Sequence, residues 1–172
     1  FTMAGVNSVQ HDWSLTGAGK LEHVSLPSDW TSIPNNFFAG SGIESFVVPR
    51  TITKIGDNAF DSCKSLKSIT FESGSSLSEI GEGAFANCTA LTTVKFPASL
   101  TTLGVASFED CTSLNNVDFT GCGKVEGRTN FLSSHPFGGC TAFTSVSIPS
   151  SMSEIGGYLF SGSSLTSITI PA

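Results

Sequence analysis

The sequence predicts a repeat solenoid: an arc of coils with short parallel strands on its concave face and irregular or short helical turns on its convex side. Three observations predict it: a strand-like hexapeptide recurs every 22 to 29 residues, a phenylalanine recurs once per period, and a proline follows the hexapeptide in five of its seven copies. A period of this length is typical of supersecondary units that bury a continuous core only by stacking on one another.

The hexapeptide, for example L-K-S-I-T-F at 66–71, has apolar residues at its first, fourth and sixth positions. Apolar positions two apart indicate a short strand with one buried face. The seven copies begin at Leu21, Ile43, Leu66, Leu91, Leu114, Phe143 and Leu165. Proline lacks the N–H that a further ladder bond needs, so it is expected to end each strand.

The second half of each copy has a different pattern, in which an apolar pair three residues apart precedes a glycine, a small residue and a phenylalanine. We expect the glycines to adopt a positive φ at a turn; they are Gly56, Gly81, Gly104 and Gly156. We expect the phenylalanines to form a stacked interior spine, each contributing roughly 2 kcal/mol or more when buried. They are Phe38, Phe60, Phe85, Phe108, Phe137 and Phe160.

With 172 residues, the chain has the size of one domain, and we expect one repeat domain over 1–172. Residues 1–20 fit the repeat poorly and are expected to be an N-terminal cap or degenerate coil, in which Trp13 and Leu15 cover the core; the alternative for Trp13 is binding. Six repeats fill 21–164, and the last strand fills 165–172. The fifth repeat has an insertion near 127–136, and Trp30 of the first can pack inside or on the convex side.

Composition excludes some function classes. The net charge is −6 and no cluster of lysine and arginine is present, which argues against binding to nucleic acid or to an anionic membrane surface. No run of 18 apolar residues occurs, so no membrane span is expected. The chain starts at Phe1 without a visible targeting segment, which suggests a mature or trimmed fragment.

Four cysteines share one repeat position: Cys63, Cys88, Cys111 and Cys140. Equivalent side chains on coils about 4.8 Å apart point in parallel, so we favour a buried reduced ladder over two disulfides. Cys122 lies in an insertion and is a candidate for exposure. The cysteines and the three histidines have no spacing that suits a metal, and no cofactor is expected.

Catalysis is not expected, because no nucleophile is placed beside a histidine in a recognisable motif. The alternative is an enzyme that uses the 127–136 loop with His135 and Glu126.

The readable surface is the concave sheet, where residues that alternate with the buried ones point outward. These candidate partner-binding residues are His23, Ser45, Val47, Ser68, Thr70, Thr93, Lys95, Asn116, Asp118, Ser145 and Ser147. Hydroxyl groups dominate and aromatic rings are scarce, which disfavours a glycan site. The face suits an extended protein or peptide partner, and the alternative is a solvated sheet without a partner.

The motif L-x-x-I-x-I-P-x-x-[LIM]-x-x-I-G-x-x-A-F-x-x-C, read over 21–172, resembles the BspA-like, or treponemal-type, leucine-rich repeats. The resemblance implies a bacterial protein that is secreted or displayed on the cell surface. It also implies adhesion to host or extracellular-matrix proteins without enzyme activity. The alternative is a structural scaffold or a self-assembling, homo-oligomeric segment of a larger surface protein. The family offers no motif that marks binding residues.

Overall fold

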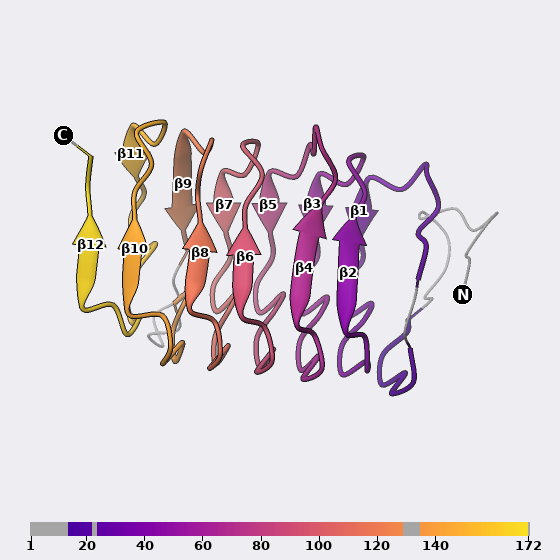
Figure 1. The fold of residues 1–172 in the computed structure, drawn as a ribbon. Helices are drawn as coiled ribbons and strands as arrows, with labels where there is room; N and C mark the ends of the chain where they lie inside the picture. Colours follow the sequence, from indigo (N-terminus) through magenta and orange to yellow (C-terminus); the bar gives the residue numbers. More distant parts are fainter. Residues whose placement is uncertain (1–13, 22–23, 129–134, 172) are drawn as a thin grey trace.

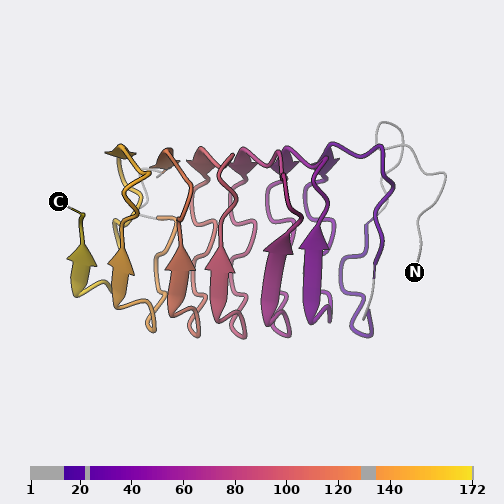
Figure 2. The same cartoon turned by 45° about the horizontal axis from the view of Figure 1, so that its top comes forward.

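The computed structural model describes residues 14–21, 24–128 and 135–171, which form a stack of coils with the two termini at opposite ends (Figure 1). The solenoid predicted from the repeat is confirmed. Figures 1 and 2 both show a stack with little curvature. The described residues contain strands and turns but no helix, so the short helical turns expected on the convex side are not found there.

The hexapeptides form strands on one side of the stack, which we call the front sheet. Its members are β2 (Ser45–Val48), β4 (Ser68–Phe71), β6 (Thr93–Lys95) and β8 (Asn116–Asp118), paired in parallel in that order, and then β10 (Ser145–Ser147) and β12 (Ser167–Thr169), paired with each other. Equivalent repeat positions pair, as Ser45 with Ser68 and Thr93 with Asn116. The register therefore follows the sequence repeat.

The return half of each coil adds a second row of short parallel strands, the back sheet, which the sequence pattern did not predict. Its members are β1 (Ser32–Ile33), β3 (Lys54–Ile55), β5 (Glu79–Ile80), β7 (Thr102–Leu103), β9 (Lys124–Gly127) and β11 (Glu154–Ile155). The second apolar residue of the return pair points into the core in the earlier coils, as Ile55 and Ile80 do, whereas Ile155 in the last coil is 38% exposed. The sequence did not reveal these strands for two reasons. An apolar pair three residues apart resembles a helical turn, and a strand of two residues is too short to show the alternation by which strands are recognised.

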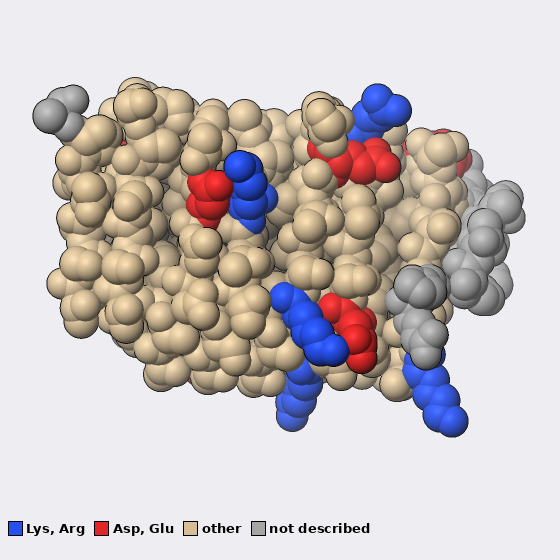
Figure 3. Space-filling view, viewed as in Figure 1, with Lys and Arg blue, Asp and Glu red and all other residues tan. Residues whose placement is uncertain are grey.

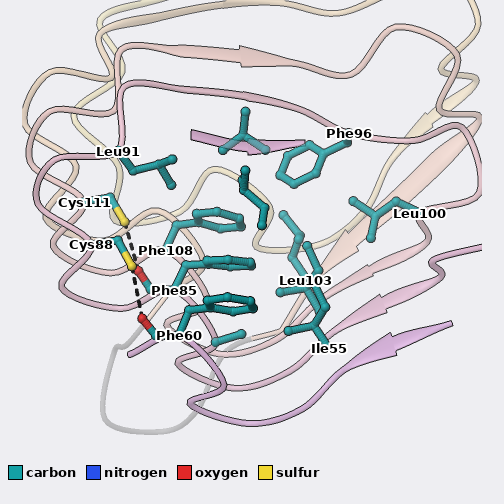
Figure 4. Packing of buried hydrophobic residues seen from close by; sticks show 14 of the residues in the cluster. Ile55, Phe60, Phe85, Cys88, Leu91, Phe96, Leu100, Leu103, Phe108 and Cys111 are labelled. Carbon is teal, nitrogen blue, oxygen red and sulfur yellow. Dashed lines mark hydrogen bonds between the residues drawn. The ribbon is translucent and has the colours of Figure 1, made fainter. Parts of the chain in front are cut away.

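The phenylalanine spine lies between the two sheets, as predicted. Phe60, Phe85 and Phe108 are fully buried and stack with neighbouring ring centroids 5.0 Å apart and interplanar angles of 9° and 13° (Figure 4). Offset stacking of aromatic rings adds stabilisation to that of burial alone. Each coil therefore presents one ring to the next.

The repeat glycines are required for close approach and not for a positive φ, so that prediction is wrong. None of Gly56, Gly81, Gly104 and Gly156 has a positive φ. A Cβ on Gly104 would lie 2.5 Å from the carbonyl carbon of Gly81, and one on Gly156 would lie 2.5 Å from the Cα of Glu126. The backbones of successive coils touch at this position, and only glycine leaves room for that contact.

The left-handed conformation occurs instead two residues after the repeat glycine and two residues after the spine phenylalanine. At the first position Asn58, Gly83 and Tyr158 have φ values of 54°, 58° and 63°; at the second, Asn87 has 59°. Asparagine and glycine adopt this conformation more readily than other residues, whereas at Tyr158 the positive φ costs conformational free energy.

All five cysteines are buried and free. The thiol Sγ of each repeat cysteine donates to the carbonyl oxygen of the spine phenylalanine one coil earlier; the sulfur–oxygen distances for Cys63, Cys88, Cys111 and Cys140 are 3.1, 3.2, 3.1 and 3.0 Å. Figure 4 shows two of these bonds. Ser41 takes the same place in the first repeat, with its Oγ 3.4 Å from the Sγ of Cys63.

The expected exposure of Cys122 is wrong. Its thiol is fully buried and points to the carbonyl oxygen of Pro97, 3.4 Å away. Cys122 lies in the longer connection after the hexapeptide 114–119, and its N–H donates to the carbonyl oxygen of Phe119 at 2.9 Å, which turns the chain back at this point. Burial, followed by the nearby carboxylate of Asp118, raises the pKa of Cys122 to about 11, so the thiol is neutral at physiological pH.

Trp30, whose placement the sequence left open, packs inside. It is 2% exposed, and its ring lies edge-on to Phe37 at a centroid distance of 5.3 Å. Leu15 also packs against the core, and its N–H donates to the carbonyl oxygen of Phe37 at 2.7 Å. The other residue proposed to cover the N-terminal end, Trp13, lies outside the described residues.

Candidate functional site

The outward side chains of the front sheet form one continuous surface, which we call the strand face. It consists of Ser45, Val47, Ser68, Thr70, Thr93, Lys95, Asn116, Asp118, Ser145, Ser147, Ser167 and Thr169. Their alternation with buried residues such as Phe46, Ile69 and Val94 fixes their direction. Figure 3 shows a largely uncharged surface with a few charged groups on it. His23, predicted to belong to it, lies outside the described residues.

The charged residues of the strand face and its margin pair across neighbouring coils. The ammonium of Lys95 lies 3.2 Å from Oδ2 of Asp118, and the ammonium of Lys67 lies 2.7 Å from Oε2 of Glu44. Because these pairs are exposed, they contribute little to stability. The sequence pattern placed Lys95 and Asp118 on one face but did not reveal that they contact each other.

Asp118 has a second partner. Its Oδ1 accepts the backbone N–H of Thr120 at 2.7 Å. Hydrogen bonding by the Thr120 side chain is the largest cause of the lowered pKa of the Asp118 carboxyl, and this backbone N–H and Lys95 lower it further. The site therefore holds a fixed carboxylate whose orientation is set by the backbone.

Three open depressions lie along the strand face. The first, of about 670 Å³, borders β2 and is lined by apolar Val24, Leu26 and Val47 together with Arg50 and Glu72. Val47 is 56% exposed, so this end of the face offers apolar area. The backbone N–H of Arg50 donates to Oε2 of Glu72 at 3.0 Å, and its exposed guanidinium Nε lies 4.0 Å from the same oxygen.

The second depression, of about 530 Å³, lies between β4 and β6 beside the longer 72–76 connection. The third, of about 500 Å³, lies over β8 and β10, and its lining is mostly polar. All three are shallow surface features of a sheet and not enclosed pockets. This shape suits contact with another macromolecule better than enclosure of a small molecule.

The sequence singled out two described residues here: His135 in the insertion and Glu126 immediately before it. Nε2 of His135 lies 3.5 Å from Oγ of Ser161, against the turn of the last coil. Glu126 belongs to the back sheet and pairs with the ammonium of Lys124 at 3.1 Å. These contacts join His135 and Glu126 to different segments, and 129–134 of the insertion lie outside the described residues.

Two negative findings concern possible sites elsewhere. Among the described residues, no group of three or more histidine, cysteine, aspartate or glutamate side chains is arranged to hold a metal ion. The same residues contain no helix of the length and apolarity that crossing a membrane requires.

The sequence also failed to reveal where the front sheet is interrupted. The step from the fifth to the sixth hexapeptide is 29 residues, against 22 to 25 elsewhere, and this was the one available signal. In the structure β8 and β10 belong to different sheets. On the back sheet the pairing register shifts by two residues beside the same insertion: β7 pairs with Glu126–Gly127 of β9, whereas β11 pairs with Lys124–Val125.

A family model described as a BspA type leucine-rich repeat region matches six copies, over residues 12–129 and 124–172. No curated protein matches the sequence significantly.

Three solved structures resemble the fold. The pneumococcal vaccine antigen PcpA is 22% identical, with a TM-score of 0.67 over 86% of this chain and 36% of that one. A leucine-rich repeat protein of Eubacterium ventriosum is 24% identical, with a TM-score of 0.67 over 85% and 38%. A leucine-rich repeat protein of T. pallidum is 25% identical, with a TM-score of 0.64 over 85% and 68%. The chain thus spans little more than a third of the first two proteins.

Proposed function

The chain belongs to the family of BspA-type leucine-rich repeat proteins, and from this premise we propose that it is a non-enzymatic protein-interaction module that binds its partner through the strand face. The observation that carries the proposal is the strand face itself: a regular row of exposed hydroxyl, amide and paired charged side chains on a sheet held from behind by a rigid core. Such surfaces in solenoid proteins are used for extended contacts with other macromolecules.

The structure supports a preformed surface. Phe46, Val94 and Phe96, which lie behind the strand face, are 5% exposed or less, so the outward side chains in front of them stand on a fixed backbone. A surface that needs no reordering loses less conformational entropy on binding.

The proposed partner is a protein of a host or of the extracellular matrix, and the proposed location is the cell surface or the extracellular space. The resemblance to BspA-like proteins, which are commonly exported and include adhesins, supports both. Adhesion to an extended matrix protein also agrees with a shallow face that lacks an enclosed pocket.

The test measures binding of the purified chain to immobilised fibronectin, to fibrinogen and to whole epithelial cells. Two variants alter the strand face at different points: Thr70→Arg, and the double reversal Lys95→Glu with Asp118→Lys, which preserves the ion pair. Thr112→Arg, at an exposed turn, is the control. Saturable binding that either face variant abolishes and the control retains is the expected result. Binding that both face variants retain would overturn the strand face as the site.

A second candidate is a structural or self-assembling segment of a larger surface protein. The observation that favours it is Val47 of β2, an apolar side chain that is 56% exposed beside the depression lined by Val24 and Leu26. Exposed apolar area of this kind suits contact with another protein surface.

Sedimentation at several concentrations tests this second candidate. A mass that grows with concentration, and a return to the monomer in a Val47→Lys variant, would support assembly through this end of the strand face. A strict monomer at high concentration would remove it.

A further inference from the structure

The insertion separates the described chain into a leading part, up to residue 128, and a trailing part, 135–171. On the front side the two parts meet where β8 (Asn116–Asp118) and β10 (Ser145–Ser147) lie next to each other (Figure 1). Within the described residues no backbone hydrogen bond joins these two strands, so β8 ends one sheet and β10 begins another. We call this place the front break.

At the front break, a hydrogen bond that the repeat makes elsewhere between neighbouring coils is redirected. The N–H of Asn115, the second residue of its hexapeptide, donates to the carbonyl oxygen of Thr92 in the neighbouring hexapeptide at 3.0 Å. The equivalent N–H of Thr144 donates instead to the carbonyl oxygen of Ala142, two residues earlier in the chain, at 3.1 Å. On the front side the two parts therefore meet without the ladder that fixes the spacing of the other strands.

The core is also looser across the same junction. The rings of Phe108 and Phe137 face each other across it with centroids 5.6 Å apart, against 5.0 Å for Phe85 and Phe108 within the leading part. Dispersion contacts weaken steeply with distance. Packing and hydrogen bonding are thus both reduced at one junction.

The hydrogen bonds that remain at this junction lie at the turn and on the return side. At the turn, the N–H of Phe108 donates to the carbonyl oxygen of Pro136 at 2.8 Å. On the return side, the N–H of Ser153 donates to the carbonyl oxygen of Gly123 at 2.8 Å. These bonds keep the junction closed in the native structure, but it lacks the front ladder that other junctions have in addition.

The stability of a solenoid is approximately the sum of terms for its coils and for the junctions between neighbouring coils. Opening under native conditions therefore begins where a junction is weakest. In this chain the trailing part has only two front strands, β10 and β12, whereas at least about three repeats are needed for a stable stack. Once detached, the trailing part should not stay folded by itself.

We propose that the front break is the line along which the solenoid parts: residues 135–171 detach and open as one cooperative unit while the leading part stays folded. The inference does not depend on the proposed function, but it bears on it. A partner that contacts the strand face on both sides of the front break would hold the unit closed. A partner confined to the strands of the leading part would not.

Three native cysteines are matched probes of this opening in the whole chain. Cys63, Cys88 and Cys140 are buried at one repeat position, and only Cys140 lies in the trailing part. Alkylation by iodoacetamide under native conditions, followed by mass spectrometry of the peptides, measures how often each thiol becomes exposed. Cys140 should be alkylated at least about tenfold faster than Cys63 and Cys88, because partial opening exposes it and not them.

Hydrogen exchange of backbone amides distinguishes opening as one unit from fraying at the end of the stack. The N–H of Ser153 donates across the junction, whereas that of Thr166 donates within the trailing part, to Thr144 at 2.8 Å. In ¹⁵N-labelled protein at low urea concentration, these two amides should share one free energy of opening, well below that of the Phe60 amide in the leading part. If the end frayed strand by strand, Thr166 would open more readily than Ser153.

Two serines at one repeat position provide a matched pair of variants. The Oγ of Ser151 accepts the N–H of Gly121 across the junction at 3.2 Å. The Oγ of Ser99 makes its bonds within the leading part, to two carbonyl oxygens of the 75–77 segment. Ser151→Ala should therefore speed the alkylation of Cys140 about threefold to tenfold, and Ser99→Ala should leave it unchanged.

The inference is overturned if Cys140 is alkylated as slowly as Cys63 and Cys88, because the chain then opens only as a whole. It also fails if Thr166 opens more readily than Ser153, or if Ser151→Ala and Ser99→Ala change the alkylation of Cys140 equally. None of these measurements uses a partner, so a failure here leaves the proposed function of the strand face untouched.

Discussion

The coils before the insertion and those after it follow the same repeat but are packed differently. Successive spine rings are 4.8, 5.0 and 5.0 Å apart from Phe38 to Phe108, and then 5.6 and 6.3 Å apart from Phe108 to Phe160. The front sheet is continuous up to β8 and interrupted after it. The thiol–carbonyl bond across the insertion, from Cys140 to Phe108, is nevertheless 3.0 Å long and matches those in earlier coils.

The difference shows which contacts of the repeat tolerate extra residues. The insertion follows the return strand β9 and precedes the spine phenylalanine, and the turn after that phenylalanine keeps its hydrogen bonds to the preceding coil. The strand register, which depends on the full path of the coil, changes instead. A solenoid of this type is therefore held at the turns and can lose pairing at the front sheet.

The largest expected effect is the loss of stability on truncating a spine phenylalanine, and it should differ between the coils before and after the insertion. Phe85→Ala should lower the free energy of unfolding by about 3–5 kcal/mol, because it empties a fully buried site between two stacked rings. Phe160→Ala should cost about half as much, since Phe160 is only partly buried and lies 6.3 Å from its neighbour. Urea unfolding measures both; equal losses would mean that the last coil is as well packed as the third.

Next in size is the glycine contact between coils. Gly104→Ala should cost about 2–3 kcal/mol, because the new Cβ would meet the Gly81 backbone at 2.5 Å. Gly156→Ala, after the insertion, meets the Cα of Glu126 at the same distance and tests whether the last coil can shift to relieve it. Gly123→Ala, with no atom within 4 Å of its Cβ, is the matched control. A neutral Gly104→Ala would contradict the close-approach explanation.

A smaller effect concerns the left-handed position two residues after the repeat glycine. Asn58 occupies it before the insertion and the exposed Tyr158 after it. Tyr158→Asn should raise the free energy of unfolding by about 0.5–1 kcal/mol, and Asn58→Tyr should lower it by about 1 kcal/mol, because asparagine accepts this φ at lower cost. Thermal melting checks both; Tyr158→Phe should leave stability unchanged, and a gain there would point to another cause.

An effect of similar or smaller size is expected at Ser107 and Ala84, which occupy the same repeat position in two coils before the insertion. Ser107 holds the repeat position that Ala84 occupies one coil earlier, and its buried Oγ has no hydrogen-bond partner among the residues that the structure describes. Ser107→Ala should therefore stabilise the protein by about 0.5 kcal/mol, and Ala84→Ser should destabilise it by about 1 kcal/mol. If Ser107→Ala destabilises, the hydroxyl has a partner that the static structure does not show.

The smallest effect concerns alkaline pH, where we expect the free energy of unfolding to decrease as the buried thiols ionise. Burial raises the folded-state pKa of Cys63, before the insertion, and that of Cys122, beside it, the latter to about 11 from an ordinary value of 9.0. A thiol whose pKa is higher in the folded state than in the unfolded state makes its full contribution to stability below pH 9. This contribution is lost as the pH rises towards the folded-state pKa, because the thiols of the unfolded chain ionise first. The melting temperature should fall between pH 9 and pH 11. In a Cys63→Ser and Cys122→Ser double variant the fall, measured from that variant's own melting temperature at pH 9, should be smaller.

Much of the architecture could be predicted from the sequence because it repeats. The alternation at Phe46 or Ile69, and the spacing of residues such as Phe85, are local patterns, and seven copies make them unmistakable. The back sheet could not be predicted, since two-residue strands such as Lys54–Ile55 are shorter than the period that reveals a strand. The role of Gly104 was misread because sequence shows that glycine recurs but not whether φ or space demands it.

The sequence by itself determined the coil, the order of the strands and the residues that face outward on the strand face, because each follows from periodic burial along one chain. Only the tertiary structure decided the ladder from thiol to carbonyl, the contact of Lys95 with Asp118 and the break between β8 and β10. These features depend on how one coil sits on the next, over separations of 23 to 32 residues. That stacking is the sum of many weak contacts, so no local pattern records it.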